Sequence, residues 1–319
     1  MIVNVEIKIR QLLVKIINLI ISLIKINPSK QNKNFIRKLY LYQKKINIKL
    51  FDDDDYLLYL YRKKYNLENN LKSIKILIIG SSHSDYGFYS PVYADSFNLG
   101  LTSGDLYTSF HLYENYKSKL QSLNYIILFY SVFSAGYSLI STSERYRSVA
   151  YKYFFNVPYQ VPKLIKRRFE KKILNKCKNL KLSDANSNFY GYERKTEFLI
   201  YQSANERAKS HLRENMREPD QLEWLIKLIS SINKDDKEIL IVIPPFRNDY
   251  KDLLPQSSIV FDKLFRLGHY MKYDILNFYD SEFFIDNDFG DADHLNEQGA
   301  IKLTKMINEY FLKKNSSMN

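Results

Sequence analysis

The chain has 319 residues, a formal net charge of +13 and 45% hydrophobic residues. This length is enough to bury a sizeable core, so it predicts one large domain or one domain with an extension. The single cysteine, Cys177, excludes an intrachain disulfide and fits a reducing compartment, so we expect a cytoplasmic protein. Lys, Ile, Asn and Tyr are all abundant. The basic charge is therefore weak evidence for a nucleic-acid partner, and we expect no specific one.

Residues 1–72 are predicted to form a mainly helical extension. In its most apolar stretch, 11–26, the polar residues lie on one narrow stripe of a helix. The stretch contains two lysines and is short for a membrane span. No small-residue cleavage site follows it, so we expect no cleaved signal peptide. Two interpretations stay open: a helix buried in a homo-oligomer, or a basic amphipathic helix that makes peripheral contact with a membrane.

The domain predicted at 73–319 begins with a short apolar run, Ile76–Ile79, that ends at Gly80. Such a β-branched run is typical of a buried parallel strand. Glycine permits a sharp turn after the strand, and Ser81 and Ser82 follow it. An α/β protein presents a nucleophile in this way, as a hydroxyl on a tight turn at the carboxyl edge of its sheet. A purely structural turn is the other interpretation.

The rest of this domain alternates between strand and helix patterns. Further strands are expected at 97–100, 125–130, 238–243 and 274–279, and helices at 103–120, after Pro219 and at 299–312. This alternation predicts a three-layer α/β/α sandwich of the flavodoxin-like type, with a central parallel sheet. Asp220 is predicted to cap the helix after Pro219 in a capping box with Glu223.

Residues 141–218 lack the alternation of a strand and are predicted to form a helical insertion. Between Arg145 and Lys181 the chain carries twelve Lys and Arg residues and a single acid, which is +11 of the formal +13. Such a patch can attract acidic ligands, and a solvated helical surface is the other interpretation. Its interleaved aromatic residues suit a nucleic-acid strand, a sugar nucleotide or a polysaccharide. Arg167 and Arg168 are our substrate-binding candidates here.

A second motif lies near the C-terminus, where 291–299 read Asp-Ala-Asp-His-Leu-Asn-Glu-Gln-Gly. Asp291 stands three residues before His294, and a helical pattern follows. A serine after the first strand and an Asp-x-x-His before the last helix together resemble the SGNH hydrolase superfamily, also called the GDSL-type esterases. The resemblance covers roughly residues 74–140 and 236–312. Gly-Ser-Ser-His is a variant of the family's Gly-Asp-Ser.

The resemblance implies a catalytic triad. Ser82 is the implied nucleophile, His294 the base that takes its proton, and Asp291 the carboxylate that orients the imidazole, with Asp293 as the alternative. His83 adjoins the nucleophile, and we expect its side chain to point elsewhere and to line the substrate pocket. The remaining histidines are expected to be non-catalytic, and they are His111, His211 and His269.

The resemblance also implies an oxyanion hole, which the family builds from the nucleophile's N–H, a Gly N–H and an Asn side chain. Ser82 and Gly100 match the first two donors. The Asn is missing after the third strand, where Ser131 stands, and Ser131 or Ser134 is the candidate replacement. Loss of one such donor typically costs about 10²–10³ in rate, so we expect weakened hydrolysis.

These motifs predict a serine-dependent acyl-ester hydrolase or O-acyltransferase. They are also similar to SGNH-like proteins of bacterial capsule and O-antigen gene sets, which implies an acylated carbohydrate as substrate. The alternative is a catalytically degenerate protein that binds an anionic glycan, a membrane surface or nucleic acid through the basic insertion. No cofactor is expected. No metal site is expected either, because the acidic run 286–288 has Asp291 where a calcium loop requires glycine.

Overall fold

The computed structural model describes residues 54–93, 95–142, 144–160, 190–195, 198 and 202–316. Its contacts divide the chain into two units, Met1–Asp55 and Tyr56–Asn319. The predicted apolar helix at 11–26 lies outside the described residues, as do Arg167 and Arg168.

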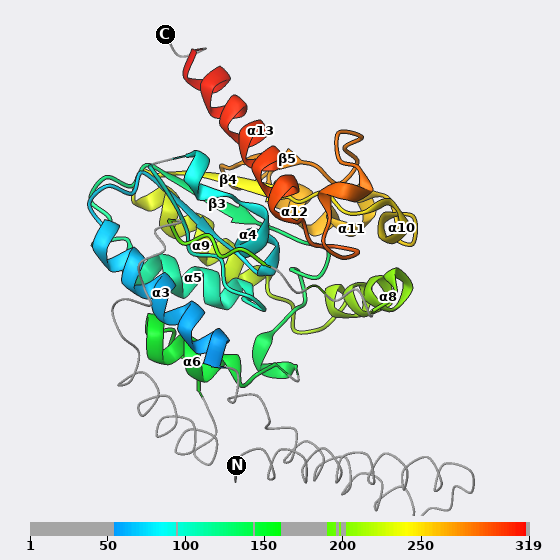
Figure 1. Cartoon of the computed structure of the whole chain (residues 1–319), viewed down its shortest axis with the longest axis horizontal. Coiled ribbons are helices and arrows are strands. Elements are labelled where there is room, and N and C mark those ends of the chain that lie inside the picture. The colour runs from blue at the N-terminus through cyan, green and yellow to red at the C-terminus, as the bar shows by residue number, and fades with distance from the viewer. Residues whose placement is uncertain are drawn as a thin grey trace, which may run out of the picture. The chain divides into compact units, whose positions relative to one another are not determined.

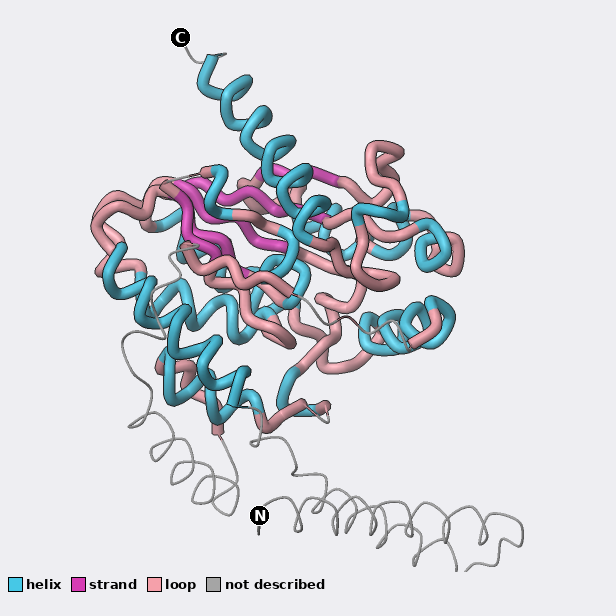
Figure 2. Tube along the Cα trace, in the orientation of Figure 1, coloured by secondary structure: helices cyan, strands magenta, loops and turns pink. Residues whose placement is uncertain are grey.

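The centre of the larger unit is a five-stranded sheet, which is magenta in Figure 2. Each pair of neighbouring strands is parallel. The strand order is β2-β1-β3-β4-β5. The bounds are Ile76–Ile79 for β1, Ser96–Asn98 for β2, Tyr125–Phe129 for β3, Glu238–Ile243 for β4 and Asp274–Asn277 for β5. The predicted parallel sheet is confirmed, with strand ends that differ by a few residues. The order changes direction between β1 and β3, and α/β sheets bind their ligands at the carboxyl ends of such strands.

Helices cover both faces of this sheet (Figure 1). On one face, α13 (Glu297–Ser316) packs against α4 (Ser82–Gly87), and Leu303 and Ile307 of α13 share a core with Ile78. On the other face, α5 (Leu106–Tyr116) packs against α9 (Leu222–Lys234). The three-layer α/β/α architecture is therefore confirmed.

Further helices complete the described part of the chain. They are α3 (Asp54–Asn70), η2 (Ser90–Val92), η3 (Leu139–Ser141), α6 (Arg147–Phe155), α8 (Ala204–Asn215), α10 (Asn248–Lys251), α11 (Ser257–Val260), α12 (Asp262–Leu267) and η5 (Asp286–Asp288). The predicted insertion contributes α6 and α8, whereas its described residues 156–160 and 190–195 are not helical. No helix among the described residues is long and apolar enough to span a bilayer.

Helix α3 belongs to the larger unit from Tyr56 on, although its sequence lies in the predicted extension 1–72. Leu57, Leu60 and Leu67 of this helix are buried. Their spacing of three and seven residues places them on one side of the helix. Part of the predicted extension thus contributes to the core of the unit that holds the sheet.

Two predicted helices begin a few residues later than expected, α9 without a side-chain cap and α5 after a capping aspartate. Helix α9 begins at Leu222, and no side chain of its N-cap residue makes a capping bond. Asp220 accepts the Leu222 N–H at 3.2 Å, while its other oxygen accepts from Lys263 Nζ at 2.9 Å, so it forms no capping box. Helix α5 begins after Asp105, whose carboxylate accepts the Thr108 N–H at 2.8 Å.

Candidate active site

The turn after β1 positions Ser82. Gly80 has φ +140°, and a Cβ there would lie 2.9 Å from Ser84 Oγ, so only glycine fits without strain. Ser81 follows as the N-cap of α4, and its hydroxyl accepts the His83 N–H at 3.4 Å. Ser82 is therefore the first residue of α4, at the carboxyl end of β1, and its side chain is partly exposed.

A buried ion pair anchors this short helix to α3. Lys63 Nζ lies 2.6 Å from Asp85 Oδ1 and 2.7 Å from the Gly100 carbonyl, and both side chains are inaccessible to solvent. Asp85 also accepts hydrogen bonds from the Tyr59 hydroxyl at 2.6 Å and from Thr102 Oγ1 at 3.0 Å. A buried charge pair needs such additional bonds to offset its desolvation. The network thereby fixes the helix that carries Ser82.

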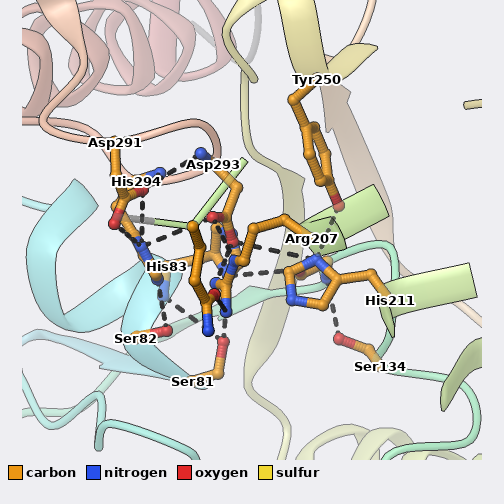
Figure 3. A network of polar contacts seen from close by, with 12 residues as sticks. Ser81, Ser82, His83, Ser134, Arg207, His211, Tyr250, Asp291, Asp293 and His294 are labelled. Atoms are coloured by element: carbon orange, nitrogen blue, oxygen red, sulfur yellow. Dashed lines mark hydrogen bonds and ion pairs between the residues drawn. The ribbon is translucent and has the colours of Figure 1, made fainter. Parts of the chain in front are cut away.

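Ser82, His294 and Asp291 form a continuous hydrogen-bonded chain (Figure 3). Ser82 Oγ lies 2.8 Å from His294 Nε2. On the other side of the ring, His294 Nδ1 lies 3.0 Å from both carboxylate oxygens of Asp291. The imidazole can thus accept the hydroxyl proton at Nε2 while Nδ1–H donates to the carboxylate. The structure brings together the three residues that the sequence motifs singled out.

Backbone N–H groups of the loop before α13 hold Asp291 in place for this hydrogen-bonded triad. Asp291 Oδ1 accepts the Asp293 N–H at 3.1 Å and the His294 N–H at 2.8 Å. Burial would raise the pKa of Asp291, but the neighbouring His294 and the Asp293 N–H bond hold that pKa below its ordinary value. The Asp-x-x-His spacing therefore lets one carboxylate hold both the loop and the imidazole.

Asp293 belongs to a second, buried network. Both of its oxygens accept from the Arg207 guanidinium of α8, at 3.0 and 2.7 Å. His294 Nδ1 lies 3.7 Å from Asp293, farther than from Asp291. Burial would raise the pKa of Asp293, but His294 and Arg207 hold it well below its ordinary value. Asp291 is therefore the closer partner of His294, as the predicted spacing requires.

His83 belongs to this second network and is absent from the wall of the cavity beside Ser82. Its ring stacks on His294 with centroids 4.8 Å apart, and only 3% of the residue is exposed. Its Nε2 lies 3.3 Å from Asp293 Oδ2, without the geometry of a hydrogen bond. Its Nδ1 lies 3.2 Å from Ser131 Oγ. Burial is the main reason that the pKa of His83 is lowered. The ring supports the back of His294, and a direct role for His83 in substrate binding stays a prediction.

The predicted oxyanion donors are engaged in different ways. The Gly100 N–H donates to Asn98 Oδ1 at 2.9 Å, and the fully buried Ser131 has its hydroxyl beside His83. Ser134 Oγ accepts the Ser131 N–H at 2.8 Å. The N–H of Ser82 lies in the first turn of α4, where backbone donors have no intrahelical partner. Of the predicted donors, this N–H is the best placed for a negatively charged oxygen.

Arg207 and His211 of the insertion contact the site, although the sequence analysis did not place either of them in it. His211, which was expected to be non-catalytic, is buried, with Nδ1 2.6 Å from the Tyr250 hydroxyl and 3.8 Å from Asp293. Burial holds its pKa well below the ordinary value. No local pattern marked Arg207 or His211, because both stand on an ordinary helical segment far from the motifs in sequence. The need for a cation follows from the burial of Asp293, which only the structure shows.

A cavity of about 560 Å³ opens beside Ser82 and His294. Its aromatic lining is Tyr86, Phe133 and Tyr137. Its size is typical of a site for a small ligand. A second hollow of about 630 Å³ lies beside α10 and residues 281–287, with no histidine in its lining. The cavity at Ser82 is therefore the candidate substrate site.

One group of residues in the described part of the chain has the spacing of metal ligands. The ligand atoms of His83, Asp293 and His294 lie within 4.8 Å of one another. Arg207 already holds both Asp293 oxygens, and a metal ion there would meet that positive charge at short range. His294 Nε2 also contacts Ser82. These residues therefore suit acid–base chemistry better than a metal ion.

The fold and the site define an α/β protein with a Ser–His–Asp chain at the carboxyl edge of a parallel sheet. No family model matches the chain, and no curated protein matches it. Among solved structures, it is similar to one described as "a putative platelet activating factor from Streptococcus pneumonia". That similarity has a TM-score of 0.42 at 14% identity and covers 85% of this chain and 98% of the other. We therefore argue the function from the geometry of the site.

Proposed function

We propose that the protein is a serine-dependent acyl-ester hydrolase or O-acyltransferase of the SGNH type. The observation that carries this proposal is the chain of hydrogen bonds from Ser82 through His294 to Asp291, at 2.8 and 3.0 Å. A serine hydroxyl is a poor nucleophile unless a base takes its proton, and a histidine oriented by a carboxylate is such a base. The cavity beside Ser82 supplies room for the ester.

The geometry supports a two-step acyl transfer. Ser82 Oγ attacks the ester carbonyl while its proton passes to His294 Nε2. The tetrahedral intermediate then expels the alcohol, which takes this proton, and leaves an acyl group on Ser82. Water or an acceptor hydroxyl attacks the acyl-serine and gives its proton to His294 Nε2. The imidazolium then passes this proton to Ser82 Oγ as the bond to the acyl carbon breaks, which releases the acid or the new ester and restores the enzyme. Asp291 remains ionised throughout and stabilises the imidazolium.

A fluorophosphonate probe tests for the activated serine. Ser82 Oγ would form a bond to phosphorus and displace fluoride, so wild-type protein should be labelled. We expect Ser82→Ala and His294→Ala to lose the label. Ser257→Ala is the matched control, because this serine is on α11 and its hydroxyl bonds to Asp280 at 2.7 Å. Absence of label on folded wild type, or its persistence in Ser82→Ala, would contradict the proposal.

An acylated carbohydrate is the substrate class that we propose. The resemblance to capsule and O-antigen proteins supports it, as do the aromatic walls of the cavity, which suit the faces of a sugar ring. Release of acetate from O-acetylated polysaccharide would identify a hydrolase. Appearance of the acetyl group on a second sugar would identify a transferase. If a labelled, active protein forms neither product, this substrate class is ruled out.

A non-catalytic binding protein is the second candidate function. The observation in its favour is that Gly100 N–H and Ser131 Oγ both have partners within the protein. An oxyanion site with a single donor would stabilise the transition state poorly. In that case an acidic glycan should bind the folded protein, the fluorophosphonate should not label it, and the affinity should fall steeply with salt.

A further inference from the structure

The cavity beside Ser82 has a surplus of positive charge. Its cationic lining residues are Arg147, Lys195, Arg207, Arg213 and Arg217, and its acidic ones are Glu144, Glu214 and Asp291. A cleft lined mainly by one sign of charge concentrates ligands of the opposite sign. The hydrogen bonds and ion pairs of these side chains within the protein show which charges are available to a ligand.

Each acid in the lining already has a partner within the protein. Asp291 bonds to His294, and Glu214 lies 2.8 Å from Arg217 Nη1. Glu144 accepts a hydrogen bond from Ser103. These carboxylates are therefore occupied, and their repulsion of an anionic ligand is reduced.

Two of the cations differ, because they meet no carboxylate among the described residues. Arg213 Nη2 donates to Ser210 Oγ at 3.2 Å, and Lys195 Nζ lies 5.0 Å from the centre of the Tyr86 ring. A guanidinium and an ammonium without an acid partner are ready donors to carboxylate or phosphate oxygens. They leave positive charge in the cavity that a ligand can neutralise.

Lys195 lies close to His294, with the Tyr86 ring in contact with both side chains. One aromatic ring, that of Tyr86, contacts both the Lys195 ammonium and the His294 imidazole, whose ring centroid lies 5.4 Å from its own. An anion on Lys195 is therefore separated from the catalytic imidazole by little more than one ring. The acyl ester and the negative charge of one small molecule can fit this spacing.

We propose that the cavity binds an acidic substrate, an acylated carbohydrate with a carboxylate or phosphate group that pairs with Lys195 and Arg213. The acyl-ester part of this inference rests on the proposed function. The acidic group is inferred independently, from the charges that line the cavity. It narrows the substrate class from carbohydrate esters in general to acidic ones. A neutral ester would leave both cations unpaired.

Binding to Ser82→Ala protein tests the acidic group separately from catalysis. Three probes share an acetyl ester: methyl 4-acetoxybenzoate is neutral, 4-acetoxybenzoate carries a carboxylate, and 4-acetoxyphenyl phosphate carries a phosphate. Calorimetry at low salt should show at least about tenfold tighter binding of an anionic probe than of the neutral one. The stronger of the two anionic probes identifies the acidic group. High salt should reduce the preference.

Variants in the Ser82→Ala background locate the contact. Arg213→Met and Lys195→Met should each reduce the preference for the anionic probe about three- to tenfold. Lys209→Met is the matched control, because Lys209 is exposed on the same helix α8, carries the same charge and is absent from the cavity lining. It should keep the preference of the parent protein.

The outcomes separate this inference from the proposed function. Equal affinity for neutral and anionic probes, or no binding of any probe, would overturn the acidic substrate. An equal loss in Lys209→Met would also overturn it, because it would assign the preference to net charge. Fluorophosphonate labelling of the wild type reports the activated serine independently. If the wild type is labelled but the probes show no anion preference, only the inference of an acidic substrate is overturned. If the probes show an anion preference but the wild type is not labelled, only the proposed hydrolase activity is overturned.

Discussion

Two polar networks meet at His294, and residues that are close neighbours along the chain belong to different ones. Ser82 and Asp291 form the outer network, which borders the cavity. His83 and Asp293 belong to the inner network, where they are 3% and 1% exposed. A step of one or two residues along the chain therefore moves a side chain from the reacting surface to the interior.

The difference shows what the partner does to two similar carboxylates, because Asp291 and Asp293 are 3% and 1% exposed. The outer carboxylate holds an imidazole that has a hydroxyl and an open cavity on its other side. The inner carboxylate meets a guanidinium on both oxygens, so its charge is fully used within the protein. We infer that the outer network carries the chemistry and that the inner one maintains the shape of the site.

The largest expected effect is that of Asp291→Asn on catalysis. The amide cannot hold the imidazole tautomer that accepts the Ser82 proton, so kcat for a small acetyl ester should fall about 10⁴-fold. Asp293→Asn, the same change in the inner network, should cost much less in kcat. Steady-state kinetics on both proteins make the comparison. A larger loss in Asp293→Asn would make Asp293 the partner of His294.

The next effect is that of Arg207→Met on stability. Its removal leaves the Asp293 carboxylate buried without its cation, which typically costs about 3–5 kcal/mol. Urea unfolding of the full chain measures the loss. Arg266→Met is the matched control, because Arg266 pairs with Asp262 in an exposed position and its loss should cost less than about 1 kcal/mol. Equal losses in the two variants would show that the inner network stabilises nothing.

The buried histidines give a smaller, pH-dependent effect. Burial lowers the pKa of His83 and of His211 in the folded protein, whereas the unfolded value is about 6.5. As the pH falls below about 6.5, the unfolded chain therefore binds protons first and stability declines, by up to about 1.4 kcal/mol per pH unit for each histidine.

Urea unfolding at pH 7 and pH 5 measures this decline. The lowered pKa values of Asp291 and Asp293 change the free energy of unfolding only below about pH 4, so they do not contribute to the difference between pH 7 and pH 5. His211→Gln keeps a polar partner for Tyr250 and should show a smaller loss between the two pH values. An unchanged loss in this variant would remove His211 from the explanation.

The smallest expected effect is that of Ser131→Ala. If the Ser131 hydroxyl serves only His83, kcat should fall less than about tenfold, with a stability cost of about 1 kcal/mol. If it donates to the oxyanion, kcat should fall by about 10²–10³. Kinetics with the same small ester distinguish the two roles, and Ser257→Ala controls for the loss of a serine hydroxyl elsewhere.

The sequence by itself determined the sheet and the outer network. A buried parallel strand is a local apolar run, so β1, β3 and β4 could be located without a structure. The turn at Gly80 and the Asp-x-x-His spacing are also local, and each places its side chains within a few residues. Since parallel strands and their loops meet at one edge, Ser82 and His294 could be expected together although they are 212 residues apart.

The tertiary structure alone decided the inner network and the anchor of α4. Arg207 and Asp293 are 86 residues apart, and Lys63 meets Asp85 from a helix that was assigned to the extension. A charged residue on a helix has the same local pattern whether it faces water or a buried carboxylate. Only the packing of α3 and α8 against the sheet unit selects between these outcomes, because burial is a property of the whole fold and is not encoded in a short stretch of chain.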